Sequence, residues 1–200
     1  MLKNNQSRRL CALFGGMLLL VPVFVHAQEF SGFSVRAIVG RDGTVGVEEH
    51  FVFDFGAAGS HGVVREIPLI SSGKTKTPID FHFISVSDKT GIPYKAEVSS
   101  GGNIALVKIG DRDMLVRGSH YYDLRYTLSG IADDHALRWQ IFTPIKESIG
   151  KIQADLYFPI PIPDITATAT CMFVPNRGGR SCVAEPLAKE KRLYGYRISA

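Results

Sequence analysis

Apolar and polar residues alternate with a period of two along most of the chain, and no long stretch follows the 3.6-residue period of a helix. The clearest run covers 44–55, and a shorter one covers 33–39. Asp42-Gly43 between these runs is a strong hairpin signal. On the apolar face of the longer run lie Val45, Val47, Phe51, Phe53 and Phe55. The pattern therefore predicts a β-hairpin over 33–55.

Further short strands follow at close spacing. They are joined by clusters of Gly, Pro, Asn, Asp and Ser, which favour turns. The predicted strands cover 79–83, 94–98, 104–109, 122–128, 137–141, 152–158, 167–173 and 193–199. Short strands at this density are typical of an antiparallel sandwich or barrel. We predict an all-β fold, an antiparallel β-sandwich of the immunoglobulin-like or a related kind.

Residues 1–27 have the layout of a secretory signal peptide. A positive start is followed by an uncharged, mostly apolar run over Leu10–Val25, and small residues precede a cleavage site between Ala27 and Gln28. The alternative is an uncleaved membrane anchor, but the apolar run is 16 residues long and bilayer-spanning helices need about 20. We therefore expect an exported domain over 28–200, in the periplasm or on the outer face of the cytoplasmic membrane.

The charge balance argues against nucleic acid as a partner. The chain carries 23 Lys+Arg against 19 Asp+Glu, and three of the cations, Lys3, Arg8 and Arg9, lie in the predicted leader. The remaining domain is nearly neutral, whereas nucleic-acid binding needs a basic surface. The hydrophobic content of 45% fits a chain that buries a core.

Two cysteines, Cys171 and Cys182, remain once the leader with Cys11 is removed. An even pair in an exported chain indicates a disulfide, and the turn residues over 175–179 can bring the two arms together. Closing so short a loop would contribute about 3 kcal/mol. A metal or redox pair is the alternative, but neither a C-x-x-C spacing nor a neighbouring histidine supports it.

Glu49 is the one charged residue on the apolar face of its predicted strand. A buried carboxylate without a partner costs several kcal/mol, so Glu49 needs an ion pair or hydrogen bonds. The nearest attractive cation in the sequence is Arg65, and we predict a structural ion pair that fixes the loop around Arg65 onto the sheet. A role for Glu49 as general acid or base would need a second positioned group.

Other candidate chemistry is sparse, and we predict neither a cofactor nor a metal site. None of the histidines beyond the leader has metal-ligand spacing: His50, His61, His82, His120 and His135. Asp111 and Asp113 fit a charged, solvated turn. The sequence contains no nucleophile elbow, P-loop or dinucleotide glycine pattern. Tyr121 and Tyr157 are the only mid-strand aromatics placed for a carbohydrate or peptide platform.

The motifs together resemble a family of bacterial predicted membrane proteins called domain of unknown function 2207. The resemblance covers nearly all of residues 30–190, and the order and spacing of its motifs make it fairly specific. It is carried by Asp42-Gly43-Thr44, His61 to Pro68, Ile109-Gly110-Asp111, Gly118 to Tyr126, Leu137-Arg138-Trp139 and the Cys171 to Cys182 loop, which matches a disulfide-like segment of the family. A departure lies at 140–144, where the family usually has Asn and Gly after the Trp.

Such proteins typically have a signal peptide, this all-β region, then transmembrane helices, and the resemblance supplies no catalytic residues. The sequence ends at Ala200, within a predicted strand, so we expect either a soluble variant or a fragment of an anchored protein. A missing closing strand would leave an unpaired sheet edge, which invites a partner strand.

We expect a non-enzymatic domain for protein–protein contacts or scaffolding in the envelope. Its partner would be an envelope protein of unknown identity, and membrane association is expected if the chain is a fragment. A glycan- or peptide-binding module is the alternative. An envelope hydrolase using Glu49 or the pair Asp111 and Asp113 is the third reading, but it lacks a second positioned group.

Overall fold

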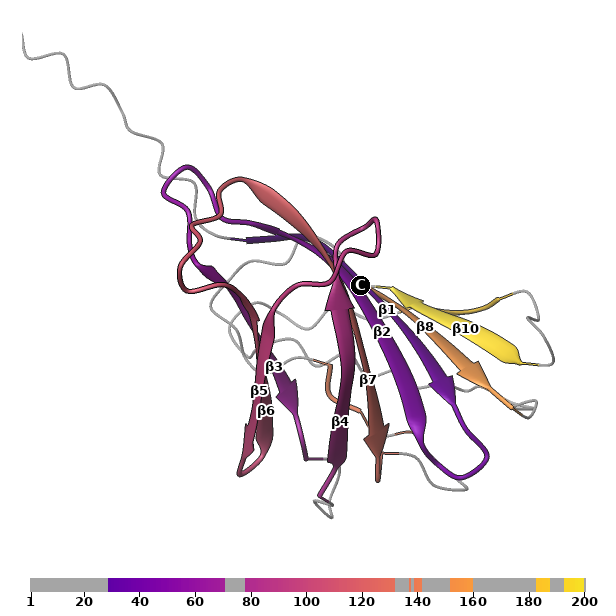
Figure 1. Ribbon diagram of the computed structural model, residues 1–200. Helices are drawn as coiled ribbons and strands as arrows, with labels where there is room; N and C mark the ends of the chain where they lie inside the picture. Colours follow the sequence, from indigo (N-terminus) through magenta and orange to yellow (C-terminus); the bar gives the residue numbers. More distant parts are fainter. Residues whose placement is uncertain are drawn as a thin grey trace, which may run out of the picture.

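The computed structural model describes residues 29–70, 78–131, 137, 139–141, 152–159, 183–187 and 193–199, and the regular elements within these ranges are strands (Figure 1). Seven strands form one sheet in the order β4-β7-β2-β1-β8-β10-β9, and three form a second in the order β3-β6-β5. The strands are β1 (Glu29–Val39), β2 (Val45–Asp54), β3 (Gly62–Pro68), β4 (Asp80–Ser87), β5 (Ala96–Gly101), β6 (Ile104–Gly110), β7 (Ser119–Ser129), β8 (Ile152–Phe158), β9 (Val183–Pro186) and β10 (Tyr194–Ser199).

The all-β prediction is confirmed, but a wholly antiparallel arrangement is wrong. β8 pairs with β1 in parallel, from Phe33 opposite Ile152 to Ile38 opposite Tyr157, so the larger sheet is mixed. Alternation of side chains shows which face of a strand is buried but carries no information on the direction of its neighbour. A parallel neighbour needs a long connection, and the chain between the end of β1 and the start of β8 covers 40–151 and includes β2 to β7.

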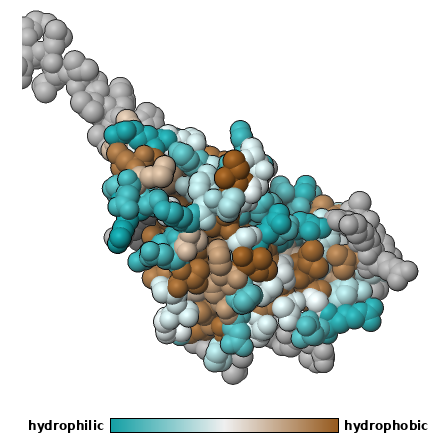
Figure 2. Space-filling view, viewed as in Figure 1, coloured by the Kyte–Doolittle hydropathy of each residue, from teal (hydrophilic) through white to brown (hydrophobic). Residues whose placement is uncertain are grey.

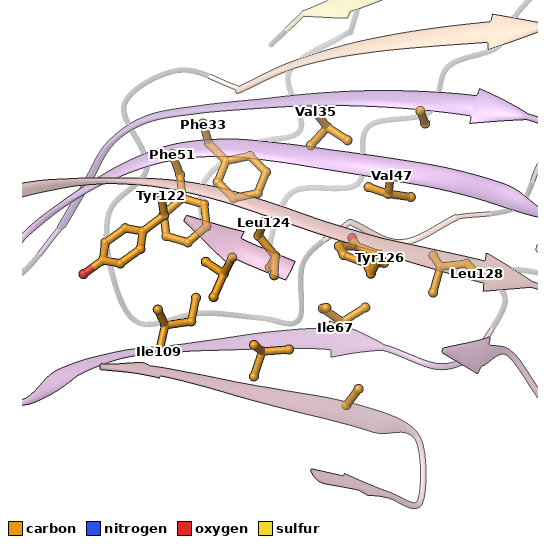
Figure 3. Packing of buried hydrophobic residues seen from close by; sticks show 14 of the residues in the cluster. Phe33, Val35, Val47, Phe51, Ile67, Ile109, Tyr122, Leu124, Tyr126 and Leu128 are labelled. Carbon is orange, nitrogen blue, oxygen red and sulfur yellow. The ribbon is translucent and has the colours of Figure 1, made fainter. Parts of the chain in front are cut away.

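The hydrophobic core lies between the inner faces of the two sheets (Figure 3). Figure 3 shows Ile67 and Ile109 of the smaller sheet facing Leu124 and Tyr126 of the larger one. Alternation produces this arrangement directly, since successive residues of β2 are alternately buried and half-buried along its whole length. The predicted apolar face of 44–55 is therefore the face that packs against the smaller sheet.

Several elements differ from the prediction. The segment around Arg65, which we expected to be a loop, is strand β3, and the short edge strand β9 gave no alternating signal. Leu137 makes an isolated bridge and 139–141 lies outside the strands, so these described residues do not form the strand predicted over 137–141. The predicted strand over 167–173, the leader over 1–27, and Cys171 with Cys182 lie outside the described residues.

Two motif glycines meet where β3 begins and β6 ends. Gly62 lies opposite Gly110, and their φ angles of +148° and +142° fall in a region that side chains disfavour. A Cβ added to Gly62 would lie 2.1 Å from the carbonyl oxygen of Ile109, and one added to Gly110 would lie 2.2 Å from that of His61. The two backbones can approach this closely only because neither residue has a side chain.

We expect Gly110→Ala to lower the free energy of unfolding by about 1–3 kcal/mol from backbone strain, with a further cost from the clash. Gly32→Ala is the matched control, because a Cβ at Gly32 meets no atom within 4 Å and its φ is not left-handed. Urea unfolding of both variants checks this. Equal stability of the two would contradict the close approach.

Candidate functional site

A buried ion pair links the two sheets. Glu49 lies on the inner face of β2 and Arg65 on the inner face of β3, with 0% and 2% of their surfaces exposed. The guanidinium of Arg65 donates from Nε to Glu49 Oε2 at 2.7 Å and from Nη2 to Glu49 Oε1 at 2.8 Å. The structure thus brings the two residues together in bidentate geometry, with Arg65 on a strand instead of a loop.

Further groups satisfy the pair. Tyr126 of β7 donates its hydroxyl to Glu49 Oε1 at 2.6 Å. Arg65 donates to the carbonyl oxygens of Ile141, at 2.6 Å, and of Glu66, and its guanidinium lies 5.3 Å from the centre of the Phe33 ring. Burial raises the pKa of Tyr126 well above its ordinary value, and the Glu49 carboxylate adds to the rise, so the phenol stays protonated and donates.

This cluster is closed to solvent, so a substrate could reach Glu49 only if the sheets separated. Its contacts join β2, β3, β7 and the segment at Ile141. That is the arrangement of an internal cross-link, in which each buried charge has an opposite charge and hydrogen bonds. The sequence signal for Glu49 is a charge on an apolar face, but Tyr126 and Ile141 carried no comparable signal.

The carboxylates of Asp111 and Asp113 do not converge on a common site. Asp111 accepts a hydrogen bond from the ammonium of Lys95 and another from the backbone of Asp113. The hydrogen bond from Lys95 lowers the pKa of Asp111. The side chain of Asp113 is 83% exposed. The turn therefore exposes Asp113, as the sequence predicts, whereas the side chain of Asp111 is 19% exposed and is held by Lys95.

The outer face of the larger sheet carries a row of alternating charges. Arg197, Asp155, Arg36, Glu48 and Arg125 come from five adjacent strands, and the register places them side by side. Arg197 pairs with Asp155 at 2.8 Å, and Glu48 lies 3.9 Å from Arg36 and 3.6 Å from Arg125. Because each carboxylate lies beside a guanidinium, the row offers no strong field of one sign.

The next row on this face contains Ser34, His50 and Asp123 on three adjacent strands. His50 Nδ1 lies 3.7 Å from Asp123 Oδ2 and 3.2 Å from the hydroxyl of Tyr121. The hydroxyl of Ser34 donates to the backbone carbonyl of His50 at 3.5 Å, so this contact does not activate Ser34 as a nucleophile. The sequence did not predict this group, because it depends on strand register.

A hollow of about 480 Å³ lies beside this row. Gly32 leaves this space open because it has no side chain, and a Cβ added there would meet no atom within 4 Å. The register of β1 also shifts at this point, between Phe30 and Gly32. We call the space the outer-face hollow, and its lining residues are Gly32, Phe33, Ser34, His50, Phe51, Val52, Tyr121 and Gln153. Of the two tyrosines predicted for a platform, Tyr121 lines it, whereas Tyr157 is buried beneath the guanidinium of Arg36, 4.7 Å from its ring centre.

The side of the fold between β4 and β5 exposes apolar residues. β4 and β5 are edge strands of the two sheets, and Figure 2 shows hydrophobic residues at the surface between them. Phe81 and Phe83 lie opposite buried residues of β7 and are half-buried, while Ile84 and Val98 are 54% and 43% exposed. Among the described residues, β7 is the only strand that pairs with Asp80–Ser85. We call the edge of β4 over 80–85, with the side chains of Phe81, Phe83 and Ile84, the β4 edge.

Within the described ranges, no group of three or more His, Cys, Asp or Glu residues is placed to hold a metal ion. The described part of the chain also has no helix of the length and apolarity that a membrane crossing requires.

The two sheets around one core, the paired motif glycines and the buried ion pair define this protein as an all-β domain. The chain belongs to the DUF2207 family, the N-terminal domain of predicted membrane proteins, whose model matches residues 29–191. The comparison with curated proteins finds no match.

Solved structures resemble the chain at low identity. They include an M1 zinc metallopeptidase from Deinococcus radiodurans, with 11% identity and a TM-score of 0.43 over 86% of this chain and 38% of that one. Leukotriene A4 hydrolase from Saccharomyces cerevisiae has 9% identity and a TM-score of 0.48, over 86% of this chain and 29% of that one. A putative protease from Parabacteroides distasonis has 8% identity and a TM-score of 0.45, over 86% of this chain and 35% of that one. The chain thus spans less than two fifths of these proteins, and the likeness concerns the fold alone.

Proposed function

We propose that this domain is an exported, non-enzymatic β-sandwich that binds an extended segment of an envelope protein at the β4 edge. The single observation that carries the proposal is that, among the described residues, only β7 pairs with 80–85, where the edge lies beside half-buried phenylalanines. Membership of a family of predicted membrane proteins supports a place at the envelope. The predicted signal peptide and the Cys171–Cys182 disulfide belong to the same proposal.

Strand addition suits this edge for two reasons. The unpaired N–H and C=O groups of an edge strand supply backbone hydrogen bonds to an added strand. An added strand would also cover apolar area at Phe81, Phe83 and Ile84, and burial of apolar surface is favourable by about 25 cal/mol per Å². Backbone hydrogen bonds of 3.0 Å fix both ends of the edge. The N–H of Ile79 donates to the carbonyl oxygen of Leu69, and the N–H of Tyr94 donates to that of Val86.

The closed cluster around Glu49 and the separated carboxylates of Asp111 and Asp113 support a binding role over hydrolysis. Hydrolysis needs a nucleophile or two positioned acid–base groups in an accessible cleft. Glu49 is committed to Arg65 and Tyr126, and Asp111 is committed to Lys95.

We expect Ile84→Lys to weaken partner binding by about tenfold or more, because a charge replaces an apolar contact at the edge. A photo-crosslinking residue at position 84 in cells would first identify the partner, and the purified pair would then be titrated. Val64→Lys is the matched control, since Val64 is 50% exposed on β3, away from this edge.

Equal binding by both lysine variants would contradict the assignment of the edge. Cross-links to a second copy of the chain would replace an envelope partner with self-association. Absence of any cross-link at position 84 in cells that produce the protein would overturn the proposal.

A further inference from the structure

We propose that the outer-face hollow is a second binding site, which takes a sugar ring of a glycan. It lies on the face of the larger sheet and is distinct from the β4 edge. Its polar side chains are a hydroxyl from Ser34, an amide from Gln153, an imidazole from His50 and a phenol from Tyr121. Small-ligand sites commonly combine a concave shape of this size with a few converging polar groups.

The chemistry of the lining favours a hydroxyl-rich ligand without net charge. No carboxylate or guanidinium lies among the residues that line the hollow, all of which the structure describes. The nearest charge is the Asp123 carboxylate, which already lies 3.4 Å from the guanidinium of Arg125 and 3.7 Å from His50 Nδ1. An anion or a cation would therefore find no unpaired counter-charge at this place, whereas a hydroxyl finds both donors and acceptors.

The rings of the hollow supply a stacking surface. Tyr121 and His50 stand nearly parallel, with centroids 6.4 Å apart and planes inclined by 26°. Burial raises the pKa of Tyr121, and the Asp123 carboxylate adds to the rise, so the phenol keeps its proton and remains a donor. An aromatic face beside polar groups suits a sugar ring, which has C–H groups on its faces and hydroxyls at its rim.

A peptide is a poorer fit for this site. Extended peptides bind mainly through backbone hydrogen bonds to a free strand edge. The residues of the hollow that lie on β2 and β8 pair with a strand on each side, so the backbone at the centre of the hollow has no free edge. Val52 is the only apolar side chain on the outer face there, as Phe33 and Phe51 point into the core.

The test is isothermal titration of the full chain with three soluble probes, chitotetraose, maltotetraose and cellotetraose. We expect at least one to bind at concentrations up to about 10 mM, and Gly32→Leu to weaken that binding by about tenfold or more by filling the hollow. Because a side chain at Gly32 meets no atom nearby, this variant should fold normally. Tyr121→Ala should also weaken binding through loss of the ring.

Gly101→Leu is the matched control, since Gly101 is also a strand glycine with nothing within 4 Å and lies on β5, in the other sheet. It should bind as the wild type does, and thermal unfolding of both variants shows that they are folded. Absence of binding by all three probes would overturn the proposal, as would binding that Gly32→Leu leaves unchanged. Gly32-dependent binding of a hydrophilic octapeptide of Ser, Asn and Ala, with none of a glycan, would replace the glycan with a peptide.

Discussion

Replacing Arg65 with methionine is expected to lower the free energy of unfolding by about 3–5 kcal/mol, because it leaves the Glu49 carboxylate buried without its counter-charge. Among the described residues, Tyr126 would be the one remaining hydrogen-bond donor to Glu49. The link between β2 and β3 and the hydrogen bond to Ile141 would also be lost. Urea unfolding, followed by circular dichroism, measures the change.

Two further variants separate the buried charge from the general loss of an arginine. The double variant Glu49→Leu with Arg65→Met should regain much of the stability, since an apolar pair of similar size removes both charges together. Arg112→Met should cost at most about 1 kcal/mol, because the side chain of Arg112 is 93% exposed and its ion pair with Asp113 is 3.9 Å long. The interpretation fails if Arg65→Met costs no more than Arg112→Met.

Phe51→Ala is expected to lower the free energy of unfolding by about 3–5 kcal/mol, through lost burial and the cavity that remains. Phe51 is 1% exposed and stacks on Phe33 and Tyr122, with ring centroids 5.7 and 5.1 Å apart. Phe30 also contacts it edge to face at 5.6 Å. This ring therefore joins β1, β2 and β7 at one point of the core.

Phe81→Ala is the comparison for this second variant. Phe81 is half-buried at the β4 edge, so its removal takes less apolar surface out of the core and leaves a space that solvent can enter. We expect less than half the cost of Phe51→Ala, measured in the same urea series. Equal costs would mean that the β4 edge is as closed as the core, which would also weaken the proposed function.

The larger part of the fold follows from alternation. The runs over 33–39 and 44–55 became the paired strands β1 and β2, with the turn at Asp42-Gly43 between them. A period of two identifies a strand with one buried face, and it works where one face meets the core and the other meets water. β3 escaped this signal because Arg65, a charged residue, occupies an inward position.

Features that depend on pairing between distant strands could not be read from the sequence. The parallel neighbour of β1 is one case, since strand direction leaves no trace in side-chain order. The row of Ser34, His50 and Asp123 is another, because a shift of one residue in either register would separate them. Glu49 was visible as a conflict between charge and position, which is why its site could be predicted.

The β4 edge and the outer-face hollow give the domain two surfaces with different chemistry. The edge offers backbone groups and apolar side chains, which suit an extended polypeptide. The hollow offers side-chain donors and acceptors on the outer face of the larger sheet. An envelope protein that held a partner strand and a glycan together would fix the position of one relative to the other.

Amide hydrogen exchange of the domain, with and without the partner identified by cross-linking, tests the central claim most directly. Strand addition forms new backbone hydrogen bonds, so we predict slower exchange over 80–85 and unchanged exchange over β3, which is the edge strand of the other sheet that lies away from β5. Protection that falls on loops or on β3, with Asp80–Ser85 unchanged, would contradict binding at the β4 edge.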